Sequence, residues 1–243
     1  MRLLVLLLVM VGAAAAQPEG LRKISYSNFT LWMDCERRGV TMFQYVLGPD
    51  RGDTKRARKF HLDKNHLDCQ QTSTSTYRRD RQGMNFPSNA TYDRGHMVPA
   101  NHFDGSKESI TETNVMTNVL PQVSIMNRGA WYETEELAEC HRQTAPVYVL
   151  GGVIWGDNPE DDYFLESHGV PTPDAFWKVL YTEPEGVIAW VMPNNAAPTR
   201  SRVGDYIVTL QELQEKTGVA VQMPEGARVA TQMWEVSPFC DRS

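Results

Sequence analysis

The sequence predicts a single α+β domain built on a central, mainly antiparallel β-sheet. Three observations lead to this class. With 243 residues, 41% of them hydrophobic, the chain can bury one sizeable core or two small ones. Several short apolar runs have the length and composition of strands, whereas only two segments have helical periodicity. No repeat, low-complexity tract or linker rich in Gly, Ser or Pro divides the chain, so we expect one folded unit.

Four segments are predicted as strands. Residues 41–47 (TMFQYVL) alternate between apolar and polar side chains, and residues 147–155 (VYVLGGVIW) form an apolar run suited to a central strand. Residues 175–181 (AFWKVLY) and 186–192 (GVIAWVM) are separated by Thr-Glu-Pro-Glu. This short connection favours an antiparallel hairpin.

Two segments are predicted as helices. Residues 127–141 are rich in Ala, Glu and Leu. Residues 203–216 have apolar side chains at helical spacing and are followed by Thr-Gly, a common helix end. These apolar positions are Val203, Ile207, Leu210 and Leu213.

The first sixteen residues have the pattern of a secretory signal peptide. Arg2 is followed by an unbroken apolar run over residues 3–11 and then by GAAAA, whose small residues signal peptidase accepts. The apolar stretch is shorter than the roughly 20 residues that a transmembrane helix needs. We therefore expect cleavage before Gln17, export to the periplasm or the extracellular space, a mature domain over residues 17–243 and no stable membrane association after cleavage.

Export determines how the four cysteines are interpreted. In an oxidising compartment an even number of cysteines predicts two disulfides, with three pairings open. A zinc site is the alternative, because His61 and His66 precede Cys69 closely, although the Cys-x2-Cys half of a common structural zinc motif is missing. The disulfide candidates are Cys35, Cys69, Cys140 and Cys240.

Charge is distributed unevenly along the chain. The formal net charge of −6 argues weakly against a protein that holds nucleic acid through a broadly basic surface. Residues 51–94, however, contain ten Lys and Arg against five Asp and Glu, whereas residues 151–243 contain six against fourteen. We expect the basic segment to face a polyanion and the acidic segment to keep the protein soluble.

The densest cluster of reactive side chains lies at residues 92–102 (YDRGHMVPANH). A histidine beside an arginine is by itself more often structural than catalytic. Two further motifs strengthen the catalytic interpretation: TNVLPQ at residues 117–122 and NRGAW at residues 127–131. Residues 127, 131 and 135 are four apart, which places their side chains on one broad side of the expected helix.

The order and spacing of Asp-Arg-Gly-His, Thr-Asn-x-x-Pro-Gln and Asn-x-Gly-Ala-Trp resemble the DNA/RNA non-specific endonuclease family, the ββα-metal nucleases of the endonuclease G-like and secreted bacterial types. The specific motifs cover residues 93–135, and weaker likeness extends from about residue 42 to residue 219. The resemblance implies a ββα-metal motif within the α+β domain. It also implies hydrolysis of phosphodiester bonds in DNA and RNA that leaves 5′-phosphate ends, with a single Mg²⁺ that Mn²⁺ can replace.

The resemblance implies a role for each reactive residue. His96 matches the general base, which suits an imidazole whose ordinary pKa is near 6.5. Asn127 matches the direct metal ligand, and Glu135 matches the carboxylate that binds the metal through water. Arg94 matches the clamp on the scissile phosphate. Arg81 stands where endonuclease G-like members carry a second phosphate-binding arginine.

Other motif residues are expected to support the site. Asp93 is expected to orient the backbone or neighbouring side chains, and Asn118 and Gln122 to support the helix and the waters of the metal. Gly95 is expected to allow a close turn inside the Asp-Arg-Gly-His motif. His102 is expected to be structural.

Alternatives remain open for several of these roles. Arg79 could take the place of Arg81, Arg94 could form a structural ion pair with Asp93, and Glu135 could be a solvated helix charge. At the level of function, the alternatives are a phosphodiesterase for small substrates, which would need a closed pocket, and a non-catalytic nucleic-acid binder.

No segment resembles a recognition helix, a zinc finger or a single-strand-binding fold. We therefore expect DNA and RNA to be bound through phosphates, without sequence specificity. The sequence leaves open the preference between DNA and RNA, the preference between single and double strands, and whether the chain forms a homodimer.

Overall fold

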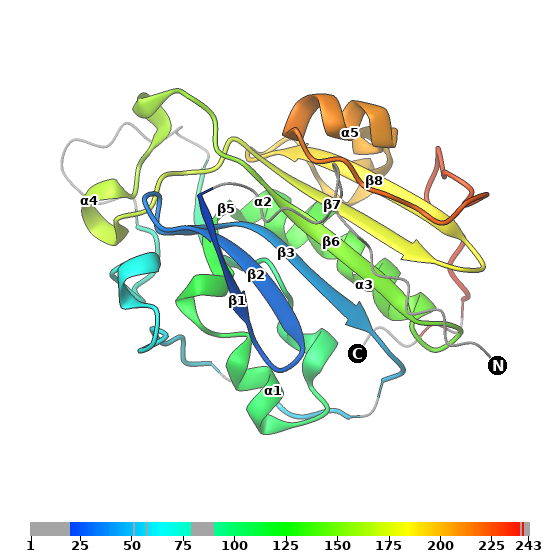
Figure 1. Cartoon of the computed structure of the whole chain (residues 1–243), viewed down its shortest axis with the longest axis horizontal. Helices are drawn as coiled ribbons and strands as arrows, with labels where there is room; N and C mark the ends of the chain where they lie inside the picture. Colours follow the sequence, from blue (N-terminus) through cyan, green and yellow to red (C-terminus); the bar gives the residue numbers. More distant parts are fainter. Residues whose placement is uncertain (1–19, 51, 57, 79–89, 239, 241–243) are drawn as a thin grey trace.

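A six-stranded antiparallel sheet forms the centre of the computed structural model, which describes residues 20–50, 52–56, 58–78, 90–238 and 240 (Figure 1). The strands follow the order β1-β2-β3-β6-β7-β8, and every neighbouring pair is antiparallel. The predicted α+β class with its mainly antiparallel sheet is confirmed. The strands are β1 (Leu21–Ser25), β2 (Phe29–Asp34), β3 (Gly39–Leu47), β6 (Val147–Ile154), β7 (Ala175–Thr182) and β8 (Gly186–Pro193).

All four predicted strands form, as β3, β6, β7 and β8, and the predicted hairpin joins β7 to β8. Strands β1 and β2 were not predicted. In β1 only Ile24 is buried, so its sequence lacks an apolar pattern. In β2 buried side chains occur on both faces, so the alternation typical of a half-buried strand is missing.

A separate two-stranded antiparallel ribbon and the helical segment after it carry the sequence motifs. The ribbon consists of β4 (Tyr92–His96) and β5 (Val119–Val123). The helical segment runs through α2 (Ser124–Met126), the π-helical turn η4 (Asn127–Trp131) and α3 (Tyr132–His141). Two strands followed by a helix form the ββα unit that the resemblance implied.

The remaining α-helices are short. They are α1 (Lys107–Glu112), α4 (Leu165–His168) and α5 (Leu210–Thr217). Helix α1 packs near the 3-10 turn Ala100–Phe103 that follows β4, and α5 contacts β6 and β8.

The helix predicted over residues 203–216 is wrong in its first half. That part is a 3-10 turn, Arg200–Tyr206, after which Ile207 leaves helical geometry and forms an isolated bridge with β8. Thr209 then begins α5, because its side chain and that of Glu212 cap each other's backbone N–H groups. The cap fixes a helix start that the apolar spacing alone did not reveal.

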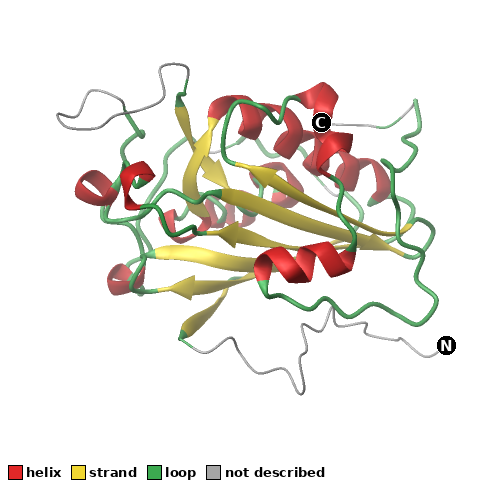
Figure 2. Ribbon diagram, turned by 90° about the horizontal axis from the view of Figure 1, so that it is seen from above, coloured by secondary structure: helices red, strands yellow, loops and turns green. Residues whose placement is uncertain are grey.

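Apolar side chains cover both faces of the large sheet. On β7, Phe176 and Leu180 belong to the core that includes residues of α3. Trp177 and Val179 point to the other face, where Leu213 of α5 covers them. Figure 2 shows helices on both sides of the sheet. The ββα unit therefore packs against one apolar face of the large sheet.

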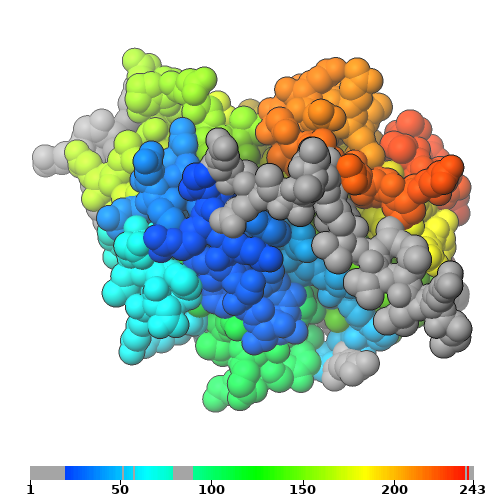
Figure 3. All heavy atoms as spheres, in the orientation of Figure 1, coloured from blue at the N-terminus to red at the C-terminus, as the bar shows by residue number. Residues whose placement is uncertain are grey.

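Two disulfides join Cys35 to Cys69 and Cys140 to Cys240, which confirms the predicted number and settles the pairing. The first fastens the segment of residues 58–78 beside β1 and β2, and these parts lie side by side in Figure 3 (cyan and blue). The zinc alternative is wrong, because a disulfide-bonded Cys69 has no thiolate to offer. Among the described residues, no helix is long and apolar enough to cross a membrane.

Residues 1–16 of the predicted signal peptide lie outside the described residues, as do both candidates for the second phosphate-binding arginine, Arg79 and Arg81.

Candidate active site

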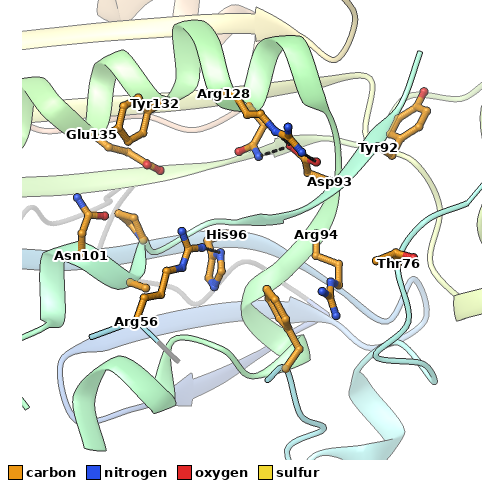
Figure 4. Close-up of a pocket in the computed structure, with 14 residues that line it drawn as sticks. Arg56, Thr76, Tyr92, Asp93, Arg94, His96, Asn101, Arg128, Tyr132 and Glu135 are labelled. Atoms are coloured by element: carbon orange, nitrogen blue, oxygen red, sulfur yellow. Dashed lines mark hydrogen bonds and ion pairs between the residues drawn. The ribbon is translucent and has the colours of Figure 1, made fainter. Parts of the chain in front are cut away.

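The sequence motifs meet at a cleft of about 600 Å³ (Figure 4). It lies between β4, the helical segment and the chain that leads into Phe60. The predicted residues that line it are Asp93, Arg94, His96, Asn127 and Glu135, and they are joined by Arg56, Phe60, Arg128 and six others. The predicted residues from Asp93 to Glu135, 42 positions apart in the sequence, thus converge on one site.

His96 ends β4 and is only 6% exposed. Its Nε2 lies 2.9 Å from Oδ1 of Asn114, whose Nδ2 donates to the carbonyl of Lys59. Because Oδ1 can only accept, Nε2 carries the proton and Nδ1 has the lone pair. Arg56 Nη2 lies 3.3 Å from Nδ1. Nδ1 is therefore the nitrogen that can accept a proton.

The pKa of His96 is lowered to about 4, mainly by burial and also by the nearby charges of Arg56 and Arg94, against the hydrogen bond to Asn114. The imidazole is consequently neutral at pH 7, the form that a general base needs. A phosphodiester bound between these guanidinium groups would offset their charge and raise the pKa of His96 toward the range where an imidazole is an effective base.

Arg94 and His96 are two residues apart on β4, so both side chains leave the same face of the strand. Arg94 Nη1 donates to the carbonyl of Thr74 at 2.8 Å. Its guanidinium carbon lies 4.0 Å from the centroid of the Phe60 ring, and the same ring is 5.2 Å from that of His96. The alternative ion pair with Asp93 does not form, and the charge of Arg94 faces the cleft (Figure 4).

Asp93 instead binds the helical segment. It accepts hydrogen bonds from Asn127 Nδ2 at 2.9 Å and from Arg128 Nε and Nη2 at 2.8 and 2.5 Å. Burial alone would raise the pKa of Asp93, but these bonds together with one from Ser124 lower it overall. Asp93 therefore orients the Asn127 amide and leaves its carbonyl oxygen for another ligand.

Glu135 is 8% exposed, so the alternative of a solvated helix charge is wrong. Burial raises the pKa of its carboxyl to about 7, while the charges of Lys178 and Arg56 oppose the increase. Lys178 Nζ lies 3.8 Å from Glu135 Oε1. The carboxylate is thus placed at the cleft wall beside a buried cation.

The oxygen donors of the cleft fit a hard divalent cation. Asn127 has a free carbonyl oxygen beside its engaged Nδ2, and Glu135 supplies a carboxylate on the same helical segment. Mg²⁺ prefers such ligands and keeps several of its waters. In the described part of the chain, no group of three or more His, Cys, Asp or Glu side chains could hold a metal ion, so the protein ligands here would be few.

The expected supporting residues have other contacts than predicted. Asn118 bonds the backbone of Val98 on both sides and the carbonyl of Thr113, so it fixes the chain after His96 and not the helix. Gln122 packs against Gly95, where any Cβ would overlap with its side chain. Gly95 lies inside β4, so the predicted close turn is wrong and the glycine is required by packing.

His102 is structural, as predicted. It is fully buried, and its Nδ1 lies 2.8 Å from the hydroxyl of Tyr45. It does not line the cleft.

Among the side chains that contact His96, Arg94 or Asp93, those of Arg56, Phe60, Asn114 and Arg128 were not predicted. Arg56 belongs to the net-positive stretch, but nothing in the sequence distinguishes it from the neighbouring Lys55 or Arg58. Arg128 occupies the variable position of the Asn-x-Gly-Ala-Trp motif. The role of Asn114 depends on a tertiary contact, for which the sequence has no signal.

Comparison with known families finds that the model of the DNA/RNA non-specific endonuclease family matches residues 13–227. Among curated proteins, mitochondrial endonuclease G of Bos taurus is 25% identical over 210 residues, which cover 80% of this chain and 67% of that protein. Mitochondrial nuclease EXOG of Mus musculus is 27% identical over 143 residues, which cover 53% of this chain and 39% of that protein.

Among solved structures, the EndoG/EndoGI complex contains a chain of the same fold. The two chains superpose with a TM-score of 0.55 at 22% sequence identity. The match covers 81% of this chain and 84% of the other.

Proposed function

The chain belongs to the DNA/RNA non-specific endonuclease family, and from this premise we propose that it is an exported enzyme that cuts DNA and RNA, with His96 as general base and a single Mg²⁺ as cofactor. The observation that carries the proposal is the shared cleft. A neutral imidazole, the guanidinium of Arg94 and two oxygen donors line the same space.

His96 would begin the reaction by removing a proton from water at Nδ1, while Asn114 keeps the other ring proton on Nε2. The water oxygen would attack phosphorus and the bond to the 3′ oxygen would break. The 3′ oxygen would take up a proton from solvent to become a hydroxyl, and the other product would carry a 5′-phosphate. Arg56 contacts Nδ1 in the free protein. An incoming phosphate would attract this guanidinium and free the lone pair for water.

The phosphate would be held by Arg94, whose planar fork can donate two hydrogen bonds to non-bridging oxygens. Asn127 would bind Mg²⁺ directly, and Glu135 would bind it through water. When bound, the ion would neutralise charge on a phosphate oxygen and on the departing 3′ oxygen. Contacts directed at phosphates have no base information, which accounts for cutting without sequence preference.

The site is tested by incubating the protein with plasmid DNA, single-stranded DNA and RNA, with and without EDTA. We expect cleavage of all three, loss of cleavage with EDTA and recovery with Mg²⁺ or Mn²⁺. His96→Ala should lose a factor of about 10²–10⁴ in rate, the usual contribution of a general base. Persistent activity after exhaustive chelation would contradict the metal role, and a folded, fully active His96→Ala variant would contradict the base.

Export is proposed from the signal-like segment of residues 1–16 and is supported by the two disulfides, which persist in oxidising compartments. N-terminal sequencing of protein recovered from the periplasm or the medium should begin at Gln17. Protein that retains residues 1–16 and stays in the reducing cytosol would contradict this proposal.

A further inference from the structure

Lys178 is a charged residue at a core position. It lies in the middle of β7 with a relative exposure of 1%. Its side chain leaves the same face of the strand as Phe176 and Leu180, both in the core that includes residues of α3. A position flanked by two such residues would ordinarily hold an aliphatic side chain.

Among the described residues, the ammonium group of Lys178 contacts the turn of helix that ends at Glu135, one of the proposed metal ligands. Its Nζ donates to Thr134 Oγ1 at 2.8 Å and lies 3.8 Å from Glu135 Oε1. The same Nζ lies 3.7 Å from the centroid of the Trp131 ring. Thr134 Oγ1 in turn donates to the carbonyl of Trp131 at 2.6 Å. One ammonium group thereby links the central sheet to three residues of the helical segment.

The energetics of buried charges indicate a role beyond stability. An ion pair inside a protein often contributes no more than well-packed apolar side chains, because both charges lose their hydration. Leaving only one of the two charges buried is costly. Lys178 and Glu135 therefore require each other, while the fold alone would be served by an apolar pair.

Glu135 is the member of the pair that reaches the cleft. We propose that Lys178 is a positioning residue, whose ammonium group holds the Glu135 carboxylate at the cleft wall and fastens the helical turn from Trp131 to Glu135 to the sheet. The inference rests on the proposed function only in assigning Glu135 to the metal. The pairing itself can be measured in metal-free protein.

The pairing is tested by a double-mutant cycle on the unfolding of the full chain in EDTA. Lys178→Met keeps the length of the side chain, and Glu135→Gln keeps its shape. We expect Lys178→Met to destabilise the protein by increasing the unfolding equilibrium constant. In a Glu135→Gln background, the same change should increase this constant by a factor about tenfold smaller. Additive effects would overturn the proposal. If Lys178→Met alone does not fold, a Lys178→Met/Glu135→Gln protein that folds supports the pairing, and one that does not overturns it.

A second experiment distinguishes an effect of Lys178 on the position of Glu135 from an effect on stability. It measures Mn²⁺ binding to the protein without nucleic acid, through the EPR signal of the free ion. We expect Lys178→Met to weaken Mn²⁺ binding about tenfold. Val179→Ala is the matched control, because Val179 is buried on the opposite face of the same strand and its truncation only destabilises. Wild-type Mn²⁺ affinity in Lys178→Met overturns the proposal. Absence of nuclease activity in the wild type would refute the proposed function and leave the stability cycle unaffected.

Discussion

The proton on Nε2 of His96 is fixed by a single side chain, Asn114, through a 2.9 Å hydrogen bond inside a buried environment. Without that acceptor, the ring could carry its proton on either nitrogen. In the tautomer with the proton on Nδ1, the ring would present no base to the cleft. Asn114 thus acts through His96 and does not line the cleft itself.

Substitution of Asn114 should therefore change the reaction without removing a cleft residue. We expect Asn114→Ala to lower kcat about tenfold or more with little change in KM, since the base loses its orientation. Asn114→Asp keeps an acceptor and adds a negative charge, which raises the pKa of His96. Circular dichroism of both variants checks that the fold is kept.

The dependence of kcat/KM on pH tests the assignment of His96 as the base. The neutral imidazole is the active form, so kcat/KM measured at saturating Mg²⁺, which keeps the Glu135 carboxylate ionised, should fall as the pH drops through the pKa of His96, which is about 4 in the free protein. In Asn114→Asp this acid limb should move to higher pH. A limb that stays in place, or moves to lower pH, would contradict the assignment of His96 as base.

Single residues were predictable where the motif carries the chemistry. His96, Arg94, Asn127 and Glu135 were found from sequence, and all four line the cleft. Asp93, which orients Asn127, belongs to the same motif, whereas Asn114 and Lys178 lie outside the motifs. Lys178 is the clearest case, because its strand sequence predicts the element correctly and gives no sign that the lysine faces the core.

At the scale of elements, sequence patterns predicted β3, β6, β7 and β8 and missed β1 and β2 of the sheet and β4 of the ribbon. A central strand such as β7 is buried on both faces and so reads as an apolar run. The edge strand β1 has one buried residue, and β4 consists largely of site residues. The chemistry of the site replaced the apolar alternation that would have identified β4 as a strand.

The two disulfides close loops of different length, and we expect them to stabilise the protein to different extents. Cys140–Cys240 links the end of α3 to the C-terminal segment across 100 residues, whereas Cys35–Cys69 spans 34. In the chain-entropy model a longer closed loop stabilises more. We expect Cys140→Ala/Cys240→Ala to lower the free energy of unfolding by about 4–5 kcal/mol, and Cys35→Ala/Cys69→Ala by about 1 kcal/mol less.

Urea unfolding of the two double variants under oxidising conditions makes the comparison, with the wild type under reducing conditions as a reference for loss of both bonds. A larger loss from Cys35→Ala/Cys69→Ala would show that native contacts near β2 outweigh the loop-length effect. A free-thiol count of zero on denatured, unreduced wild type checks that both bonds form.

For the whole molecule, the net charge of −6 is a poor guide to the partner. The excess of negative charge lies in residues 151–243, which contain fourteen Asp and Glu against six Lys and Arg. Three arginines line the cleft: Arg56, Arg94 and Arg128. The α+β architecture followed from composition and strand patterns. The position of the cleft did not, because it depends on how the ββα unit packs on the sheet and where the chain before Phe60 crosses it.

This local concentration of positive charge makes nucleic-acid binding sensitive to salt. Each phosphate neutralised by an arginine releases counterions, so the affinity falls with a log–log slope of about −0.9 per contact. With about three such contacts, raising NaCl from 50 to 200 mM should increase KM for plasmid DNA about 40-fold, while kcat changes little. Steady-state cleavage assays at constant Mg²⁺ measure both quantities.

Two variants test whether the salt dependence of binding comes from the cleft arginines. Arg56→Gln should reduce the magnitude of the slope by about one, because one contact is lost. Arg228→Gln is the matched control, since Arg228 is exposed, lies in the acidic part of the chain and pairs with Glu185 away from the cleft. It should leave the slope unchanged. Equal slopes in all three proteins would mean that the cleft arginines do not contact phosphates and that the net charge of the whole molecule governs binding.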